Sequence, residues 1–478
     1  MVSFYYLVSG ENLFKNGFYL TLSEFIFAMS NEKVKGNVIG RMERLPISRV
    51  HYKFLLLVMG GEWVETLMLL GNGVIAAVLS SVLFSSITVA VTAITTAFFL
   101  GETVGSVFFG RLADLKGRRT VFLINLLLFG FGSIIAGFMS NFYVISVLMF
   151  IAGIGVGGEF PLVDTYTSEM MPGKLRGSGV ALVYTLAVTS APVIALVTYF
   201  SSHPLNYYSW RIPLWFMGGA ALIVWALRTR LDESPRWLES KGRRSEADAI
   251  VEKWENEVLR EGKTLPEPEK TEVVEEHSKI SELFSHSLRK RTIMMIIFQF
   301  FQSGIFYGFV VLAPEFLLDK GISLVNTLLF SILIDTGFIV GSIFNYFIID
   351  KVDRKYGIIG SAVSAGILGT AFALTSSTAL TVLLGFLVAF SLWNFSNFFH
   401  TYQAEIFPTR VRSTGAGLVY SISRFSTSIL VLMITAFFLP LGLVATFGII
   451  WVFIAIVSLD IGIFGPKTTG RKLEDISK

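Results

Sequence analysis

The sequence predicts an all-α integral membrane protein whose twelve transmembrane helices form two six-helix halves. Of its 478 residues, 53% are hydrophobic and only 15% are charged, whereas soluble chains carry about 25% charged residues. Twelve membrane helices need about 240 apolar positions, and the mean hydropathy of +0.65 agrees with that demand. This composition excludes an ordinary soluble enzyme. The absence of cysteine also excludes disulfides, thiolate metal sites and cysteine nucleophiles.

Twelve apolar segments, each about 18 to 28 residues long, are bounded by charged residues and can cross a bilayer as helices. We expect them to begin near Phe54, Ser86, Thr120, Phe142, Arg176, Arg211, Thr292, Leu324, Gly357, Leu380, Arg412 and Leu441. The predicted divisions are a cytoplasmic N-terminal extension, a first six-helix half, a cytoplasmic linker, a second six-helix half and a cytoplasmic tail, at residues 1–52, 53–228, 229–291, 292–464 and 465–478.

The distribution of Lys and Arg predicts how the chain is oriented. Cations occur in the loops between spans 2 and 3, 4 and 5, 8 and 9, and 10 and 11, and are nearly absent from the alternate loops. Because cytoplasmic loops carry the excess of Lys and Arg, both termini are predicted to be cytoplasmic in a multi-pass protein of the cell membrane. The net charge of +4 then belongs to that surface, and no nucleic-acid partner is expected.

The linker is rich in charge, and its acids and bases from Ser245 to Arg260 follow a periodic pattern. That pattern is typical of an amphipathic surface helix. A disordered tether is an equally good interpretation of the same segment.

An internal repeat relates the two halves. The pattern Y-x2-E-x2-P-x3-R-x2-G begins at Tyr166 and recurs 236 residues later at Tyr402. A second group of residues, Gly101, Gly105, Ser106, Asp114 and Arg118, recurs at the same offset as Gly337, Gly341, Ser342, Asp350 and Arg354. Two independent motifs with one offset, near half the chain length, indicate duplicated halves of the kind from which many transporters are built.

Three loop motifs carry a resemblance to a known family. They are GRLADLKGRR at residues 110–119, ESPRWL at 233–238 and AEIFPTR at 404–410. In this order they resemble the major facilitator superfamily, and in particular its group of sugar porters and organic-ion or metabolite–proton symporters. The resemblance implies a rocking-bundle carrier with alternating access and a substrate site at the membrane midplane between the halves.

The same loops predict a cytoplasmic gate. A carboxylate beside a guanidinium can hold two helices together in one conformation and release them in another. We expect Asp114 to pair with Arg118 and Arg119, and Asp350 to pair with Arg354. The other expected pairs are Glu169 with Arg176 and Glu405 with Arg412. Simple anchoring of the loops by their positive charge is the alternative, which the repetition disfavours.

Ionisable residues within the spans are the candidates for function, because each costs about 2.5 to 3.5 kcal/mol at a helix centre. They are Glu62, Glu65, Glu102, Glu159, Asp335, His400 and Arg424. A buried carboxyl favours its neutral form, so it can take up a proton on one side and release it on the other. We expect proton coupling by Glu62, Glu65, Glu159 and Asp335. In proton-linked members of the superfamily that the chain resembles, the coupling acid lies near Glu65; a structural hydrogen-bonded pair is the alternative.

Arg424 is predicted to bind the substrate. A permanently charged guanidinium in mid-helix must avoid lipid and face a central cavity, and its fork suits a carboxylate or phosphate. Many organic-anion and aromatic-acid carriers that resemble this chain have an arginine there. The alternative is that Arg424 only pairs with a buried acid such as Glu65 or Asp335.

Further substrate contacts are predicted at Gln299, Gln302, Tyr307, Trp393, Asn397 and His400. Compared with sugar porters, the helix 7 glutamines are out of register, and Met149, Tyr184 and His400 replace an expected arginine, glutamine and tryptophan. The stretches 157–162 and 306–308 instead resemble phosphate–proton symporters.

The sequence therefore predicts proton-coupled symport of a small organic anion or similar metabolite. The expected partners are the solute, protons and the bilayer, and the carrier is expected to act as a monomer driven by the proton gradient, with no cofactor, no metal and no enzymatic reaction. A sugar or polyol porter is the main alternative. A phosphate symporter and a non-transporting sensor are less favoured.

Overall fold

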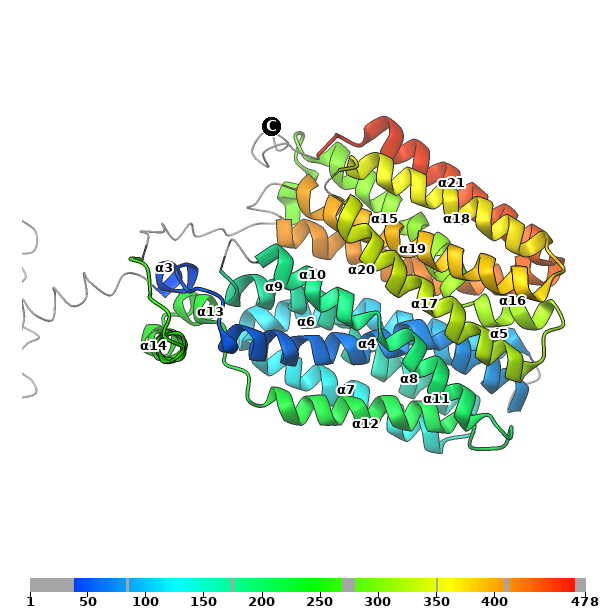
Figure 1. The fold of residues 1–478 in the computed structure, drawn as a ribbon, viewed down its shortest axis with the longest axis horizontal. Helices are drawn as coiled ribbons and strands as arrows, with labels where there is room; N and C mark the ends of the chain where they lie inside the picture. Colours follow the sequence, from blue (N-terminus) through cyan, green and yellow to red (C-terminus); the bar gives the residue numbers. More distant parts are fainter. Residues whose placement is uncertain are drawn as a thin grey trace, which may run out of the picture.

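The computed structural model describes residues 38–82, 86–172, 176–268, 280–349, 351–407 and 412–468, and within them the secondary structure is helical, with no strand. Figure 1 shows the long helices lying side by side in two bundles. One bundle contains the helices of the first predicted half and the other those of the second. The duplication inferred from the repeat thus corresponds to two spatial units.

The first bundle covers the six spans predicted before the linker. Its helices are α4 (Arg49–Val82), α5 (Ile87–Val91), the π-helical turn η1 (Thr92–Thr96), α6 (Ala97–Lys116), α7 (Arg118–Phe138), α8 (Phe142–Gly157), α9 (Glu159–Met170), α10 (Arg176–Ala187), α11 (Ser190–Ser201) and α12 (Arg211–Arg228). The helices α8 and α9 together cover one predicted span, and α10 and α11 together cover another. A single predicted span can therefore contain two helices.

The second bundle covers the other six spans. Its helices are α15 (Arg289–Val310), α16 (Ala313–Asp319), α17 (Leu324–Ile348), α18 (Arg354–Leu374), α19 (Thr378–Ile406), α20 (Arg412–Met433), the turns η5 (Ile434–Phe438) and η6 (Leu439–Leu441), and α21 (Leu443–Phe464). Short polar side chains start several of these helices. Ser323, Asp353 and Ser377 each accept a backbone N–H in the first turn, as helix N-caps do.

Within the described residues, eleven helices are long and apolar enough to cross a membrane. The remaining predicted span, the sixth, is α12, which has 18 residues and both begins and ends on an arginine, so its mean hydropathy is lower. Each of the twelve predicted spans therefore coincides with helix.

Glycines bring α6 and α8 into close contact. A Cβ at Gly105 would collide with the carbonyl oxygen of Ile154, and a Cβ at Gly153 or Gly157 would collide with the backbone of α6 at Phe98 or Glu102. Small residues at such positions let two helix backbones approach closely. The pair forms a rigid unit that carries Glu102.

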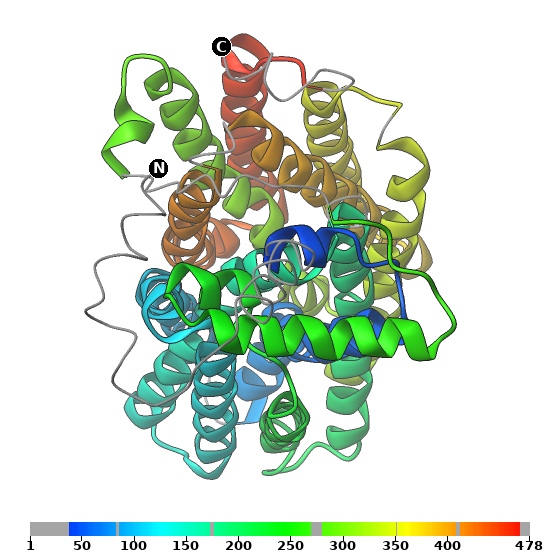
Figure 2. The same ribbon diagram turned by 90° about the vertical axis from the view of Figure 1, so that its left-hand side faces the viewer.

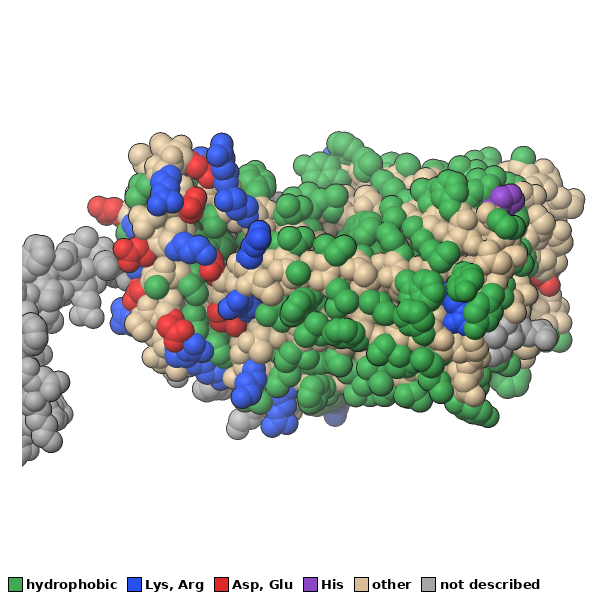
Figure 3. Space-filling view, turned by 90° about the horizontal axis from the view of Figure 1, so that it is seen from below, with side chains coloured by type: hydrophobic (Ala, Val, Ile, Leu, Met, Phe, Trp, Pro, Cys, Tyr) green, Lys and Arg blue, Asp and Glu red, His purple; other side chains and the backbone are tan. Residues whose placement is uncertain are grey.

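Three short helices lie together at one end of the molecule: α3 (Val38–Glu43), α13 (Pro235–Ser240) and α14 (Arg244–Arg260). We call them the cap (Figures 1 and 2). The helix α14 confirms the amphipathic helix predicted from Ser245 to Arg260. Charged side chains gather at this end, whereas the middle of the visible face is mostly hydrophobic (Figure 3). The side of the membrane on which the cap lies stays a prediction.

Ion pairs hold α3 against α14. Arg41 donates to both carboxylate oxygens of Glu255 at 3.1 and 2.6 Å and to Asp248 at 2.8 Å, and Arg44 donates to Glu255 at 2.6 Å. Burial opposes the ionised carboxylate, but the hydrogen bonds from Arg41 and Arg44 prevail and hold the pKa of Glu255 below its usual value. Residues preceding the first span thus dock on the linker; the boundaries predicted at 52 and 229 stay predictions.

Candidate functional site

Arg424 lies on α20 at the contact between the two halves and is 1% exposed. Its Nε is 3.1 Å from Oε2 of Glu102, on α6 of the first half. Its Nη1 donates to the hydroxyl of Tyr307 on α15 at 2.5 Å, and its Nη2 donates to the hydroxyl of Tyr420. All three guanidinium nitrogens are therefore engaged, and the ion pair with Glu102 ties one half to the other.

Aromatic rings surround the Arg424 guanidinium. Its Cζ lies 4.6 Å from the ring centroid of Tyr420, 5.0 Å from Phe160, 5.4 Å from Tyr307 and 6.0 Å from Phe99. Each ring is within the range in which its face attracts a cation. The predicted substrate residue Tyr307 is thus a direct neighbour of Arg424. The acid that pairs with Arg424 is Glu102, not the predicted alternatives Glu65 and Asp335.

Two further acids, Glu62 and Glu65, lie one helical turn apart on α4 and are 0% and 2% exposed. Among the described residues, no hydrogen-bond partner is present for either oxygen of either carboxyl group. Glu65 also lines a cavity of about 10 Å³ together with Asn125 and Glu159, which is about the space that one water molecule needs. Three of the four predicted proton-coupling residues therefore lie in one region.

Glu159 has a cation partner that the sequence-based prediction does not include. Its Oε1 is 2.5 Å from Nη2 of Arg228, the last residue of α12. The same guanidinium donates to the α4 carbonyls of Leu57 and Val58 at 2.9 and 2.8 Å. Acids within membrane spans commonly pair with a cation. The arginine at the end of the sixth span is therefore the sequence signal for this ion pair.

Gly61 makes room for this pair. A Cβ at Gly61 would collide with the Arg228 guanidinium and with Oε1 of Glu159. The pair consequently packs directly on the backbone of α4, one residue before Glu62. A glycine in the first span, just before two acids, is the sequence signal for this close approach.

The predicted glutamines form a buried polar network in the second half. Gln302 donates to Oε1 of Gln299 and to Oγ of Ser423, both at 2.8 Å. Gln299 in turn donates to Oε1 of Gln403. This network links α15 to α19 and α20 and reaches α20 at Ser423, the residue before Arg424.

His400 joins the two halves through its ring. It stacks on Phe399 at 4.4 Å and on Tyr184 of the first half at 6.0 Å. Tyr184 donates to Asp164 at 2.8 Å. The repeat persists here, because Asp164 and His400, like Tyr184 and Tyr420, are 236 residues apart. Asp164 is not among the residues predicted from the sequence. Its partner Tyr184 is twenty residues away in the chain, so the spacing of the residues does not reveal their contact.

The structure does not bring the other predicted residues to Arg424. Trp393 packs on Phe306 and Phe338, at 6.3 and 5.7 Å between ring centroids. Asn397 is half-buried on α19, where its carbonyl accepts from Thr401. Asp335 is half-buried on α17, and no described charged group acts on it. Asp335 therefore lies apart from the other predicted proton-coupling acids.

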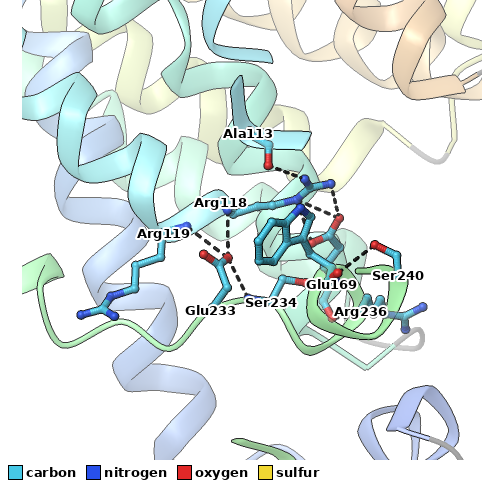
Figure 4. Close-up of polar contacts among 9 residues, drawn as sticks. Ala113, Arg118, Arg119, Glu169, Glu233, Ser234, Arg236 and Ser240 are labelled. Carbon is cyan, nitrogen blue, oxygen red and sulfur yellow. Dashed lines mark hydrogen bonds and ion pairs between the residues drawn. The ribbon is translucent and has the colours of Figure 1, made fainter. Parts of the chain in front are cut away.

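Arg118 and Glu169, two residues of the predicted gate, form an ion pair at the cap end of the first half (Figure 4). Nη2 of Arg118 is 2.9 Å from Oε1 of Glu169, and Nη1 donates to the carbonyl of Ala113 at 2.9 Å. In the second half, Arg354 pairs with Glu405 at 3.4 Å and donates to the carbonyl of Ile349. The repeat offset relates every member of the two sets.

The described contacts add partners that the predicted pairing does not include. Glu169 and Glu405, expected to pair with Arg176 and Arg412, are bound by Arg118 and Arg354. The guanidinium of Arg119, expected to pair with Asp114, donates to the carbonyl of Thr229 at 2.6 Å. Asp350 and the side chains of Asp114, Arg176 and Arg412 lie outside the described residues.

Glu233, from the motif at 233–238, joins this gate to the cap. Its Oε1 accepts the backbone N–H groups of Arg118, Arg119 and Ser234 at 2.8, 3.2 and 3.0 Å. A carboxylate here meets the positive end of the α7 dipole. Burial nevertheless raises the pKa of Glu233, against these N–H donors, which lower it. Arg236 then connects the carbonyl of Glu169 to the side chain of Glu43 in the cap.

Two homologous bundles that meet at a buried, polar centre define a membrane carrier with the major facilitator fold. The chain matches the family described as "Sugar (and other) transporter" over residues 7–478, and it belongs to that family. It is thus a multi-pass membrane protein that transports small solutes.

Its relatives include several bacterial transporters. It is 29% identical to a putative metabolite transport protein, YyaJ, of Bacillus subtilis, over 94% of this chain and 99% of that protein. It is 27% identical to the niacin transporter NiaP of Acinetobacter baylyi, over 92% and 99%, and 27% identical to an arabinose-proton symporter of Bacillus subtilis, over 80% and 85%.

A solved structure has the same fold. The xylose transporter XylE from E. coli, in a partially occluded inward open conformation, superposes with a TM-score of 0.71 over 89% of this chain and 100% of that chain, at 19% identity. The predicted twelve-helix fold and the predicted superfamily are both confirmed.

Proposed function

We propose that this carrier moves a small organic monocarboxylate across the membrane together with a proton. The observation that carries the proposal is Arg424, buried at the contact between the halves and surrounded by aromatic rings. A guanidinium fork binds a carboxylate through two parallel hydrogen bonds. The rings of Phe160 and Tyr420 offer flat apolar surface beside it. A planar carboxylate such as nicotinate fits this combination, in line with the niacin transporter among the relatives.

The charge balance of the buried groups supports proton coupling. Among the described residues, the buried charged groups around Arg424 and in the adjoining core of the first half include four glutamates and two arginines: Glu62, Glu65, Glu102, Glu159, Arg228 and Arg424. Removing an unpaired charge from water costs several kcal/mol, so the two acids of this group that have no described cation partner carry protons. These are Glu62 and Glu65. The buried core beside the proposed anion site therefore stabilises protonated acids, and an acid that can gain and lose a proton there is what symport requires.

The ion pairs at the cap end supply the gate in this proposal. Arg118 with Glu169, and Arg354 with Glu405, tie the ends of neighbouring helices together in each half. Breaking these ties lets the helix ends within each half shift as the halves rock about the central site. Transport of this kind involves no enzymatic step and no cofactor, and one chain contains the whole site, so we propose a functional monomer.

A sugar porter is the second candidate, and the buried glutamine network favours it. Amides of Gln299 and Gln302 offer donors and acceptors that suit sugar hydroxyls, and Oε1 of Gln302 has no hydrogen-bond partner among the described residues. The arabinose-proton symporter among the relatives points the same way.

Uptake into proteoliposomes separates the two candidates. With the outside more acidic, labelled nicotinate should accumulate, and unlabelled benzoate but not arabinose or xylose should compete. Arg424→Lys keeps the charge but not the fork and should abolish accumulation, whereas Lys241→Gln, on the exposed end of α13, should have no effect. Uptake of arabinose that nicotinate does not inhibit would instead establish the sugar porter.

A further inference from the structure

We propose that Glu102 occupies the place of the substrate carboxylate on Arg424, and that protonation of Glu102 exchanges one for the other. This inference rests on the proposed function and assigns the transported proton to a particular residue. In the exchange, a proton adds to the Glu102 carboxylate and its ion pair with Arg424 breaks. The substrate carboxylate then forms the new ion pair with the same guanidinium.

The occupancy of the Arg424 guanidinium carries the first step of the argument. Glu102 forms an ion pair with Nε, the hydroxyl of Tyr307 accepts a hydrogen bond from Nη1, and the hydroxyl of Tyr420 accepts one from Nη2. The two phenol hydroxyls can stay, because a hydroxyl both accepts and donates hydrogen bonds and can donate to an incoming carboxylate. Glu102 cannot stay as an anion, because one guanidinium charge does not compensate two carboxylates in a dry site.

The second step concerns mobility. Glu102 belongs to the rigid α6–α8 unit, in which Gly153 and Gly157 of α8 pack on the backbone of α6 at Glu102 itself. The carboxyl group is 0% exposed, so water cannot stabilise it as an anion after separation from Arg424. Neutralisation by a proton is the remaining way to release the pair.

The third step identifies which acid changes its ionisation. The titratable groups that act on Glu102 or share its partner Arg424 are Arg424 and Tyr420 of α20, Tyr307 of α15, Glu62 and Glu65 of α4, and His400 of α19. Among the described residues, neither Glu62 nor Glu65 has a hydrogen-bond partner for its carboxyl oxygens, and both are already neutral by the charge balance. His400 stacks on the rings of Tyr184 and Phe399 and makes no described ion pair. Glu102 makes the ion pair that substrate must replace, so its ionisation changes when substrate binds.

The ion pair also ties substrate binding to movement of the halves. Glu102 and Arg424 join α6 to α20 across the contact. Protonation alone leaves the Arg424 guanidinium buried without an anion, which is costly, so movement of a carrier loaded only with a proton is disfavoured. Protonation with substrate bound leaves Arg424 satisfied by the substrate carboxylate, and release of both restores the pair between Glu102 and Arg424.

The experiment measures nicotinate binding to the purified full-length protein at a series of pH values. Binding that takes up one proton should weaken about tenfold per pH unit on the alkaline side. Glu102→Gln imitates the protonated acid, so it should bind nicotinate with an affinity independent of pH. It should exchange labelled for unlabelled nicotinate in proteoliposomes but should not accumulate it against a gradient. The comparison variant Glu65→Gln should keep the pH dependence of binding.

Proton uptake on binding, followed with a pH-indicator dye in weak buffer, gives a second readout in case Glu102→Gln does not fold. Wild type and Glu65→Gln should each take up one proton per nicotinate bound. Loss of that uptake in Glu65→Gln, or an unchanged pH dependence in Glu102→Gln, overturns the role of Glu102 while leaving anion transport standing. Absence of nicotinate and benzoate binding to wild type at every pH overturns the proposed function, and this inference with it.

Discussion

The two halves agree closely at the cap end and differ at the centre. At the cap end, Arg118 and Glu169 are 2.9 Å apart and their repeat counterparts Arg354 and Glu405 are 3.4 Å apart. At the centre, the first half contributes glutamates, including Glu102, and the second contributes amides and Arg424. The duplicated fold has kept the Arg–Glu ion pair in both copies and has divided the buried charged groups of the centre between them, with the glutamates in the first half and Arg424 in the second.

This division explains why the centre has to be formed from both halves. Neither half has a balanced charge at its buried surface, and the ion pair between Glu102 and Arg424 supplies part of the balance. Gate contacts, by contrast, are satisfied within each half. Substitutions at the centre should therefore affect the first and second halves differently, whereas substitutions in the two predicted gate pairs should have similar effects.

The largest effect is expected at Arg424. Arg424→Gln leaves Glu102 buried without a cation, which costs about 3 to 5 kcal/mol when a buried pair is broken, and it removes the proposed anion site. We expect nicotinate uptake to fall to background and the thermal midpoint of unfolding to drop. The double variant Arg424→Gln with Glu102→Gln removes both charges and should recover the thermal midpoint but not uptake. Nicotinate uptake at the wild-type rate by the single or the double variant would contradict the assignment of the anion site to Arg424.

Gly61 tests the pair that balances charge inside the first half. Gly61→Ala places a methyl group against Arg228 and Glu159, and overpacking of this kind costs about 1 to 3 kcal/mol. The matched control is Gly219→Ala on α12, where a Cβ meets nothing within 4 Å and helix propensity favours alanine by about 0.5 to 1 kcal/mol. Thermal unfolding in detergent should fall for the first variant and hold or rise for the second. Equal midpoints would show that the pair can move away from α4.

The gate pairs test the symmetry between halves. A double-mutant cycle on Arg118 and Glu169 should give a coupling energy of about 1 to 2 kcal/mol, as expected for a partly buried, charge-assisted contact. The cycle on Arg354 and Glu405 should give a somewhat smaller value because their separation is longer. Chemical unfolding of the four variants of each cycle measures both energies. A coupling near zero in one half alone would mean that the gate is not duplicated in function.

The smallest effect is expected in the cap. Because the folded pKa of Glu255 is lowered, its contact with Arg41 and Arg44 stabilises the cap fully above the ordinary glutamate pKa of about 4.3. That stability is lost as pH falls through the lower, folded value. We expect about 1 kcal/mol, allowing for partial exposure, seen as lower protection of the α3 amides at acidic pH, relative to their intrinsic exchange rates at the same pH. Glu255→Gln should show the lower protection already at neutral pH; protection in that variant equal to wild type would rule the contact out as the cause.

The spans and the duplication could be predicted because they depend on local or regularly repeated properties. Apolar length locates the twelve helices, and a single offset of 236 residues relates the halves. The gate partners could not be predicted in this way. Glu169 is seven residues from Arg176 but 51 from Arg118, its observed partner, and sequence spacing favours the nearer residue.

The central site shows the same limit. The sequence identifies Arg424 as a functional candidate because a guanidinium in mid-span is costly. It does not distinguish which of several glutamates, or Asp335, is the acid partner. Only the packing of α6 on α20 selects Glu102. Arg228 was not predicted for a different reason: at the end of a span it looks like an ordinary interfacial cation, and only Gly61 and Glu159 reveal that it is buried.

The mutual neutralisation of Glu102 and Arg424 has an electrical consequence for the proposed cycle. A carrier in which this pair is closed has no net charge at its centre, and a carrier with one carboxylate and one proton added has none either. Membrane voltage does work of about 2.3 kcal/mol per elementary charge per 100 mV only on charge that crosses the field. Accumulation should therefore follow the pH difference across the membrane and be indifferent to its voltage, so that a potassium diffusion potential imposed with valinomycin would leave uptake unchanged.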